Sequence, residues 1–112
     1  MFYKRGPEVA LYRIEQLSRL HDGYKNSIDL DGENLLLLQH EGRVYLIENK
    51  CPHMDVSLSD AKLMPGQKLQ CRAHGIEFQL EDGKACGPLA NTLACLKRYP
   101  LIYDGDFIAV EL

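Results

Sequence analysis

Two short segments of the sequence each combine a cysteine with a histidine. The first is Cys51-Pro52-His53, and the second, Cys71-Arg72-Ala73-His74, begins after seventeen further residues. Thiolate and imidazole both bind metals, and a pair one or two residues apart in a tight loop can place both donors on one centre. Any one of these side chains alone is more often a buried cysteine or a surface histidine. The mirrored pairs predict two loops that clamp a metal centre.

The order of the four ligands bears on the kind of metal. Common zinc fingers pair cysteine with cysteine and histidine with histidine, whereas each half of this pattern is mixed. In a Rieske-type [2Fe–2S] centre two cysteines hold one iron and two histidines hold the other. The spacing C-x-H-x17-C-x2-H fits that division, because each loop then contributes one ligand to each iron. The alternative outside the iron–sulfur proteins is an interaction module in which the same four side chains bind a structural zinc ion.

The elements that must position these loops are predicted to be strands. Four Asp-Gly pairs and one Glu-Gly pair supply residues with positive φ for tight hairpin turns. Segments rich in β-branched, aromatic and aliphatic residues lie between the turns, at 24–30, 34–40, 43–48, 76–80, 93–99 and 107–112. This spacing predicts an all-β protein, an antiparallel sandwich or barrel.

Three segments do not follow simple alternation. The run 35–38 is apolar throughout and fits either a strand buried on both faces or one turn of helix, and the glycine-bearing turns on either side favour the strand. Ile14, Leu17 and Leu20 have a spacing that suits a helical turn, in a segment too short to predict one. The stretch 87–92 is predicted to be a loop.

Length and composition narrow the class of protein. The chain has 112 residues, of which 46% are hydrophobic and 26% charged, as expected for a single packed domain. A net charge of -3 without a long basic run argues against nucleic acid as a partner. No apolar run approaches the roughly 20 residues of a membrane span, and no signal-peptide pattern precedes residue 10. A cytoplasmic location is expected, where thiols seldom form structural disulfides.

Beyond the ligands, the sequence resembles the Rieske ferredoxin family over nearly its whole length. The matching features are Cys51-Pro52-His53 with Leu58 downstream, Cys71-x-x-His74-Gly75-x-x-Phe78, Asp82-Gly83, Gly87-Pro88, Tyr99-Pro100 before Asp104-Gly105, and the approach strand 44–50. One departure is Arg72, where many members have proline after the second cysteine. This departure affects the local loop and removes no ligand.

The resemblance implies a fold and a ligand assignment. The expected fold is the Rieske iron–sulfur fold, a single domain over 1–112 with a small cluster-binding subdomain inserted at roughly 51–87. Cys51 and Cys71 would hold the buried iron, while His53 and His74 would hold the outer iron near solvent. One [2Fe–2S] cluster per chain is the expected cofactor.

The ligands and their surroundings also predict a reduction potential. Two imidazoles in place of two thiolates make the cluster less negative and easier to reduce. High-potential members carry two hydroxyl donors near the second box and a disulfide between the loops. Ile76 and Phe78 stand at the hydroxyl positions here, and Val56 and Ala73 at the bridging positions. We therefore expect a potential near the low end of the Rieske range, about -150 mV.

The function implied by the resemblance is electron transfer. The sequence has no glycine-rich nucleotide fingerprint and no separate two-histidine, one-carboxylate iron site, so neither a reductase nor an oxygenase large subunit is expected. A monomeric one-electron shuttle between a reductase and a terminal oxygenase is expected, with no catalytic residue of its own. A small subunit of an assimilatory nitrite reductase is the alternative within the same fold.

Docking is expected to be transient and to surround His53 and His74. The residues expected at the rim of this surface are Met54, Asp55, Val56, Gly75 and Pro88.

Four further cysteines and histidines lie outside the ligand pattern. Cys86 and Cys95 have no ligand-like partner, and the apolar neighbours of Cys95 predict that it is buried. His21 and His40 lie beside turns and are predicted to be solvated or structural.

Overall fold

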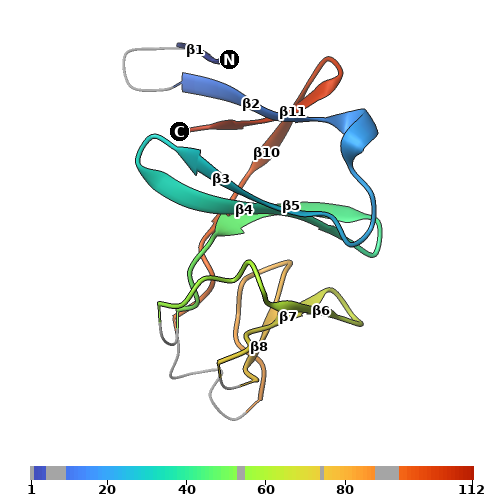
Figure 1. The fold of residues 1–112 in the computed structure, drawn as a ribbon, viewed down its shortest axis with the longest axis vertical. Helices are drawn as coiled ribbons and strands as arrows, with labels where there is room; N and C mark the ends of the chain where they lie inside the picture. The colour runs from blue at the N-terminus through green and yellow to red at the C-terminus, as the bar shows by residue number, and fades with distance from the viewer. Residues whose placement is uncertain (1, 5–9, 53–54, 74, 88–93) are drawn as a thin grey trace.

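The computed structural model describes residues 2–4, 10–52, 55–73, 75–87 and 94–112. Within these ranges the chain forms antiparallel strands in three sheets and a 3-10 turn, η1, at Leu17–Arg19. The all-β prediction is therefore confirmed. Figure 1 shows the second sheet between the first and the third.

The first sheet has the order β1-β2-β11-β10, and the second has the order β3-β4-β5-β9. In the first sheet the strands are β1 Phe2–Lys4, β2 Ala10–Gln16, β10 Leu101–Asp104 and β11 Phe107–Glu111. In the second they are β3 Lys25–Leu30, β4 Glu33–His40, β5 Arg43–Glu48 and β9 Arg98–Tyr99. The third sheet consists of β6 Lys62–Met64, β7 Lys68–Gln70 and β8 Glu77–Gln79, in that order.

Strand β4 separates two hydrophobic cores. All four leucines at 35–38 have no exposed surface, which confirms a strand buried on both faces. Since successive side chains of a strand point to opposite faces, Leu36 and Leu38 join the core next to the third sheet. Leu35 and Leu37 pack with Ile108 of the first sheet. Burial of each of these leucine side chains stabilises the folded state by roughly 1.5–3 kcal/mol. Because two of them pack into each core, β4 links the two cores.

The hairpins on either side of β4 have the turn geometry that their sequences predict. Asp31 and Gly32 have φ of 52° and 81°, and Glu41 and Gly42 have φ of 50° and 80°. Positive φ at both central residues of a two-residue loop is the type I′ arrangement, which matches the twist of the flanking strands. The turns therefore set the register of both hairpins, with Leu30 opposite Glu33 and His40 opposite Arg43.

The strand predictions failed mainly at short strands. Strand β2 takes up Ile14 in extended structure, and only from Leu17 does the chain form the 3-10 turn. Strands β1, β2, β6, β7 and β10 were not predicted. All of these except β2 have only three or four residues, which give too little periodicity to detect. The segment predicted at 93–99 is a strand only at Arg98–Tyr99, and residue 93 lies outside the described ranges. Most of the predicted loop at 87–92 also lies outside them.

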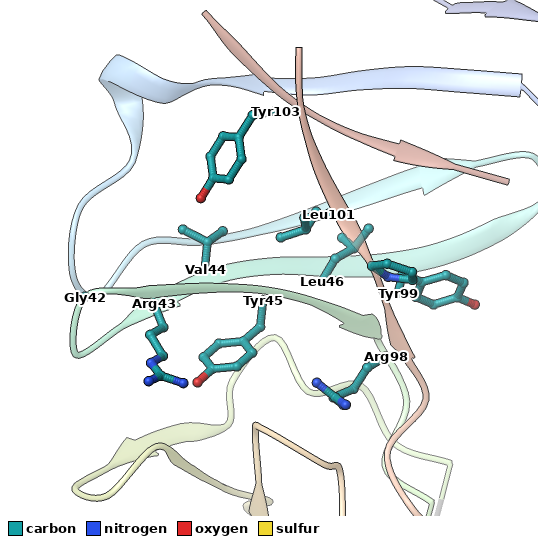
Figure 2. Close-up of a pocket in the computed structure, with 10 residues that line it drawn as sticks. Gly42, Arg43, Val44, Tyr45, Leu46, Arg98, Tyr99, Leu101 and Tyr103 are labelled. Atoms are coloured by element: carbon teal, nitrogen blue, oxygen red, sulfur yellow. The ribbon is translucent and has the colours of Figure 1, made fainter. Parts of the chain in front are cut away.

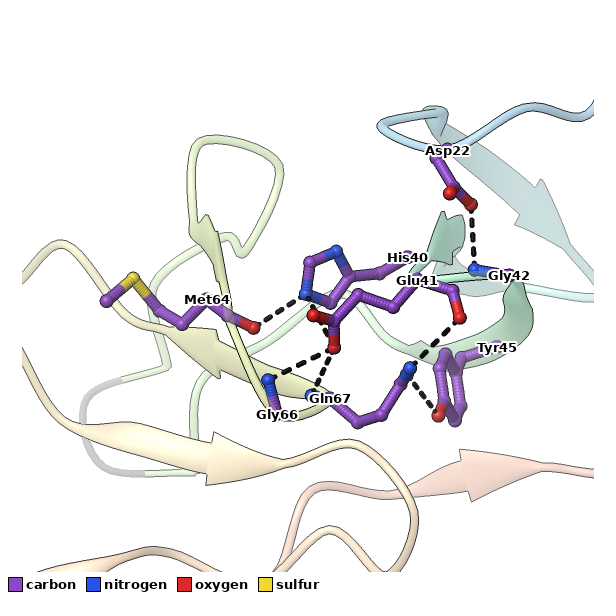
Figure 3. A network of polar contacts seen from close by, with 8 residues as sticks. All are labelled: Asp22, His40, Glu41, Gly42, Tyr45, Met64, Gly66 and Gln67. Atoms are coloured by element: carbon purple, nitrogen blue, oxygen red, sulfur yellow. Dashed lines mark hydrogen bonds and ion pairs between the residues drawn. The ribbon is translucent and has the colours of Figure 1, made fainter.

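A polar network joins the β4–β5 turn to the turn between β6 and β7 (Figure 3). The Glu41 carboxylate accepts hydrogen bonds from the backbone N–H groups of Gly66 at 3.1 Å and Gln67 at 2.8 Å. The Gln67 amide in turn donates to the Glu41 carbonyl at 3.2 Å and accepts from the Tyr45 hydroxyl at 2.7 Å. His40 donates to the Met64 carbonyl at 2.6 Å. These bonds fix the third sheet against the second.

In the part of the chain that the structure describes, no helix is long and apolar enough to span a membrane.

Candidate metal centre

Cys51 and Cys71, the two cysteines of the predicted ligand set, are both buried. Their exposed fractions are 0% and 1%, and both belong to the core between the second and third sheets. Cys51 follows β5 and Cys71 follows β7, so the two thiols enter this core from strands of different sheets. The side chains of Leu58 and Phe78, both without exposed surface, belong to the same cluster. Both thiols therefore lie in apolar surroundings from which water is excluded.

The loop after Cys51 is closed by two backbone hydrogen bonds. The Cys51 N–H donates to the Val56 carbonyl, and the Asp55 N–H donates to the Cys51 carbonyl, both at 2.8 Å. Asp55 has a φ of 58°, in the left-handed region that residues other than glycine seldom adopt. The backbone thus turns back on itself within five residues and brings Val56 beside Cys51.

The loop after Cys71 repeats this arrangement. The Cys71 N–H donates to the Ile76 carbonyl at 2.8 Å, and the Gly75 N–H donates to the Cys71 carbonyl at 3.0 Å. Gly75 has a φ of 69° and occupies the same position relative to its cysteine as Asp55. The two loops therefore share the same closing hydrogen bonds and a positive φ at the same position, each with a buried cysteine at its start.

Asn49 braces the first loop, a role that was not predicted from the sequence. It is the one buried polar residue in the described ranges, with 9% exposed. Its side-chain oxygen accepts from the Leu58 N–H at 2.8 Å, and its side-chain nitrogen donates to Asn34 at 2.7 Å and to Ser59 at 2.9 Å. A polar residue directly after a strand and two positions before a cysteine of the predicted ligand set was the available signal.

The second loop has a weaker polar brace. The Gln70 side-chain nitrogen donates to the Gly75 carbonyl at 3.3 Å, in an exposed setting. Leu96, which belongs to the same core as Cys71, lies in tight backbone contact with Gly83. The Gly83 N–H donates to Gln79 at the end of β8, and the Leu96 N–H donates to the Gly83 carbonyl at 2.7 Å. A side chain at Gly83 would place its Cβ 2.4 Å from the Leu96 carbonyl oxygen, so this approach requires glycine.

The surface beside both loops is hollowed. Residues of both loops line a cavity of about 360 Å³: Val56, Ser57, Asp60, Arg72 and Ala73. Val56 is 37% exposed, one of two large hydrophobic side chains in the described ranges with that much exposure. Val56 and Ala73, which the resemblance placed at the bridging positions, thus face one cavity from opposite loops. Asp55 and Gly75 are also exposed.

His53 and His74, the predicted imidazole ligands, lie outside the described residues, as do Met54 and Pro88 of the predicted rim. Among the described residues no group of three or more His, Cys, Asp or Glu side chains forms a metal site. Ile76 is half-buried and Phe78 is fully buried at the two positions where hydroxyl donors were considered.

The prediction that Cys95 is buried is wrong. Cys95 is exposed, and Cys86 is half-buried. The apolar neighbours of Cys95 misled the prediction because residues 94–97 do not form a strand, and only Leu96 among them reaches the core. The predictions for the other two histidines are confirmed: His21 is exposed beside its turn, and His40 is held in the network with Met64.

Comparison with known proteins identifies the class of this domain. Residues 10–100 match the model of the Rieske [2Fe–2S] domain, so the chain belongs to that family. The cofactor is therefore a Rieske-type [2Fe–2S] cluster. The donor set fits it, because two buried thiols at equivalent positions of two like-folded loops are the thiolate half that such a cluster needs.

Particular relatives are ferredoxins of oxygenase systems. The chain is 35% identical over 91 residues to the ferredoxin component of an alkene monooxygenase system of Xanthobacter autotrophicus, covering 81% of this chain and 72% of the relative. It is 29% identical over 105 residues to the ferredoxin component of a naphthalene 1,2-dioxygenase system of Pseudomonas aeruginosa, covering 93% and 91%.

Solved structures agree on the fold. The ferredoxin of carbazole 1,9a-dioxygenase from Nocardioides aromaticivorans matches with a TM-score of 0.76 at 23% identity, over 89% of this chain and 95% of that one. A chain of an oxygenase and ferredoxin complex of carbazole 1,9a-dioxygenase matches with a TM-score of 0.78 at 23% identity. The present chain spans 28% of that longer chain. The likeness confirms the Rieske iron–sulfur fold.

Proposed function

We propose that the protein is a one-electron carrier that takes an electron from a reductase and delivers it to a terminal oxygenase. The relatives named as ferredoxin components support this role, since one of them is matched over 91% of its own length. The observation that carries the proposal is the pair of buried thiols at equivalent positions of two loops with the same hydrogen bonds. The protein transfers electrons and is not itself the enzyme, so it has no catalytic residue.

In this proposal Cys51 and Cys71 bind one iron of the cluster, and His53 and His74 bind the other. The burial of both thiols supports their assignment to the inner iron. The histidines follow their cysteines by two and three residues, in loops that turn back on themselves toward exposed residues such as Asp55 and Gly75. When bound, the cluster supplies a one-electron redox couple. The chain supplies the apolar surroundings and the two loops that hold the cluster. It forms a single domain, 1–112, with one cluster site in a cluster-binding subdomain at roughly 51–87.

The potential of this carrier is proposed to be low, about -150 mV. Hydrogen bonds to cluster sulfur raise the potential of an iron–sulfur centre. The aromatic side chain of Phe78, fully buried, carries no hydroxyl, and neither does Ile76. Protein-film voltammetry measures the potential directly, and a strongly positive value contradicts this part of the proposal.

The partners are proposed to dock on the surface around His53 and His74. Asp55, Val56 and Gly75 are exposed there, beside the cavity that both loops line. An electron carrier must leave as readily as it arrives, so a contact below about 1,200 Å² is expected. The structural match to an oxygenase and ferredoxin complex supports a terminal oxygenase as one partner. A monomer in the cytoplasm is proposed, where the exposed Cys95 stays reduced.

The cofactor and its ligands are tested on anaerobically purified protein. We expect a red-brown protein with iron and acid-labile sulfide in equal amounts, and the reduced form should give the electron paramagnetic resonance signal of a mixed-ligand cluster. His74→Ala should lose the cluster, whereas the matched variant His21→Ala, at an exposed histidine outside the loops, should keep it. A colourless protein with one zinc per chain would favour the zinc-stabilised interaction module and contradict the proposed electron-carrier function.

The role as a shuttle is tested by turnover. Reduced protein is mixed with a purified terminal oxygenase of a naphthalene or alkene system, and product is measured against electrons supplied. Turnover that depends on the protein, together with a monomeric elution volume, supports the shuttle. Stable co-elution with a larger enzyme from the native host would instead indicate a fixed subunit, as in a nitrite reductase.

A further inference from the structure

A second surface feature lies on β5, away from the cysteine loops. It is a groove of about 410 Å³ formed where the chain crosses from β9 in the second sheet to β10 in the first (Figure 2). The residues that line it come from β5, β9, β10 and their junctions: Gly42, Arg43, Val44, Tyr45, Leu46, Arg98, Tyr99, Pro100, Leu101 and Tyr103. The proposed electron transfer makes no use of this groove.

One wall of the groove is an open edge of β5. In the described part of the chain β5 pairs with β9 at Leu46 and Ile47 and no further toward its start. The pairing stops because Pro100 follows Tyr99, has no N–H group to donate, and leads the chain into the other sheet. Residues 43–45 of β5 thus have a strand on one side and the groove on the other.

The backbone groups that face this opening belong to Val44. The Glu48 N–H donates to the Lys97 carbonyl at 2.9 Å, which places the polar groups of Glu48 on the β9 side. Alternate residues of a strand direct their N–H and C=O groups to the same edge. Those of Leu46 and Val44 therefore point the same way, and at Val44 no strand of the described residues receives them. Such an edge is a template for one more strand.

The side chains on the two sides of this edge differ in character. Figure 2 shows Arg43, Tyr45 and Arg98 on one side of β5, and Val44 and Tyr103 on the other. An added strand alternates its side chains between the same two sides. One set of its side chains would meet the two arginines, and the other set would meet aliphatic and aromatic surface.

The charges favour an acidic occupant. The lining contains two arginines and no carboxylate, on a protein whose net charge is -3. Arg98 has no ion pair with a described residue. Arg43 pairs with Glu81 at 2.6 Å, but both side chains are more than half exposed, so the pair contributes little and is readily exchanged. Tyr103, 70% exposed, offers an apolar surface that nothing in the described chain covers.

We propose that this groove receives an extended segment of a partner protein, with alternating acidic and apolar residues, as an additional strand on the edge of β5. Main-chain hydrogen bonds at Val44 hold the segment, and the arginines and Tyr103 select its side chains. The site gives the carrier a second attachment point that leaves the cluster loops free.

The experiment uses the cluster-loaded protein and a fluorescent seven-residue peptide of alternating Glu and Val. We expect binding by fluorescence anisotropy that weakens with added salt, and slower amide hydrogen exchange at 43–46. Arg98→Glu should weaken binding by about tenfold or more, and Arg19→Glu, the same charge change at an exposed arginine outside the groove, by less than about twofold.

Two control peptides test the strand and the charge separately. A peptide with Lys in place of Glu should not bind, and one methylated on alternate backbone nitrogens should lose most of its affinity. Equal binding of the methylated peptide, or no binding of the acidic peptide at about 1 mM, overturns the proposal. So does a dimer in sedimentation that Arg98→Glu dissociates, because the edge would then be occupied by a second copy of the chain.

Discussion

The two cysteine loops have the same backbone hydrogen bonds but are supported by different means. At the first loop lies the buried Asn49, whose side-chain amide forms hydrogen bonds with Asn34, Leu58 and Ser59. At the second loop, Gln70 makes one exposed hydrogen bond to the Gly75 carbonyl. The same closing hydrogen bonds are therefore accompanied by a buried polar brace in the first loop and by a weaker, exposed one in the second.

The position four residues after each cysteine differs in the same way. Gly75 adopts its positive φ without steric cost, whereas Asp55 adopts a similar φ with a side chain. The lesson is that the hydrogen-bond pattern, and not the residue type, defines the loop. The predictions below test how far this equivalence extends.

The largest effect is expected at the cysteines. Cys51→Ser and Cys71→Ser should each abolish cluster binding, because a hydroxyl is a poor ligand for iron in a buried site that two thiolates share. Iron and sulfide content with visible absorption measures the loss. Full cluster content in either variant would break the equivalence of the loops and remove that cysteine from the ligand set.

The next largest effect is expected at Gly83. Gly83→Ala combines a side chain at φ 78° with a Cβ 2.4 Å from a backbone oxygen, and should lower the free energy of unfolding by about 3 kcal/mol or more. Gly66→Ala is the control, since its φ is 87° but nothing lies within 4 Å of its Cβ. Denaturant unfolding of both variants separates steric overlap from backbone strain, and equal losses would argue that overlap is unimportant.

The braces themselves should differ in strength. Asn49→Ala leaves the buried Leu58 N–H without a partner and should lower the free energy of unfolding by about 1–3 kcal/mol. Gln70→Ala removes one exposed bond and should stay within about 0.5 kcal/mol. Unfolding midpoints of the two variants give the comparison, and a larger loss for Gln70→Ala would reverse the assignment of the braces.

Substitutions at the two turn positions, Asp55 and Gly75, should change the free energy of unfolding by smaller amounts and in opposite directions. Asp55→Gly should relieve the strain of a left-handed residue, while Gly75→Ala should introduce it at a cost of about 1–2 kcal/mol. Cluster content should be retained in both, since the hydrogen bonds stay the same. If Asp55→Gly loses the cluster, the Asp55 side chain has a role beyond the turn.

The smallest effect is expected at Cys95. Because this side chain is exposed, Cys95→Ser should change stability by no more than about 0.5 kcal/mol and leave the cluster spectrum unaltered. Thermal unfolding and visible absorption of the variant check both statements.

Much of the fold was predictable because it depends on local signals. Glu41-Gly42 and Asp31-Gly32 specify type I′ turns by their own conformational preferences, and these turns on either side of the apolar run at 35–38 predict that it is a strand. The spacing of the cysteine and histidine pairs pointed to the Rieske family in the same way, which the match over residues 10–100 confirms. In each case neighbours in sequence carry the information.

What the tertiary structure alone decided rests on residues far apart in the chain. The bond from Glu41 to Gln67, the brace from Asn49 to Leu58 and Asn34, and the open edge at Val44 all depend on how the sheets pack, as does the exposure of Cys95. A sequence pattern reports the preference of a segment for strand or turn. It does not report which partner satisfies a buried polar group or which edge is left uncovered, because these depend on contacts formed only when the whole chain folds.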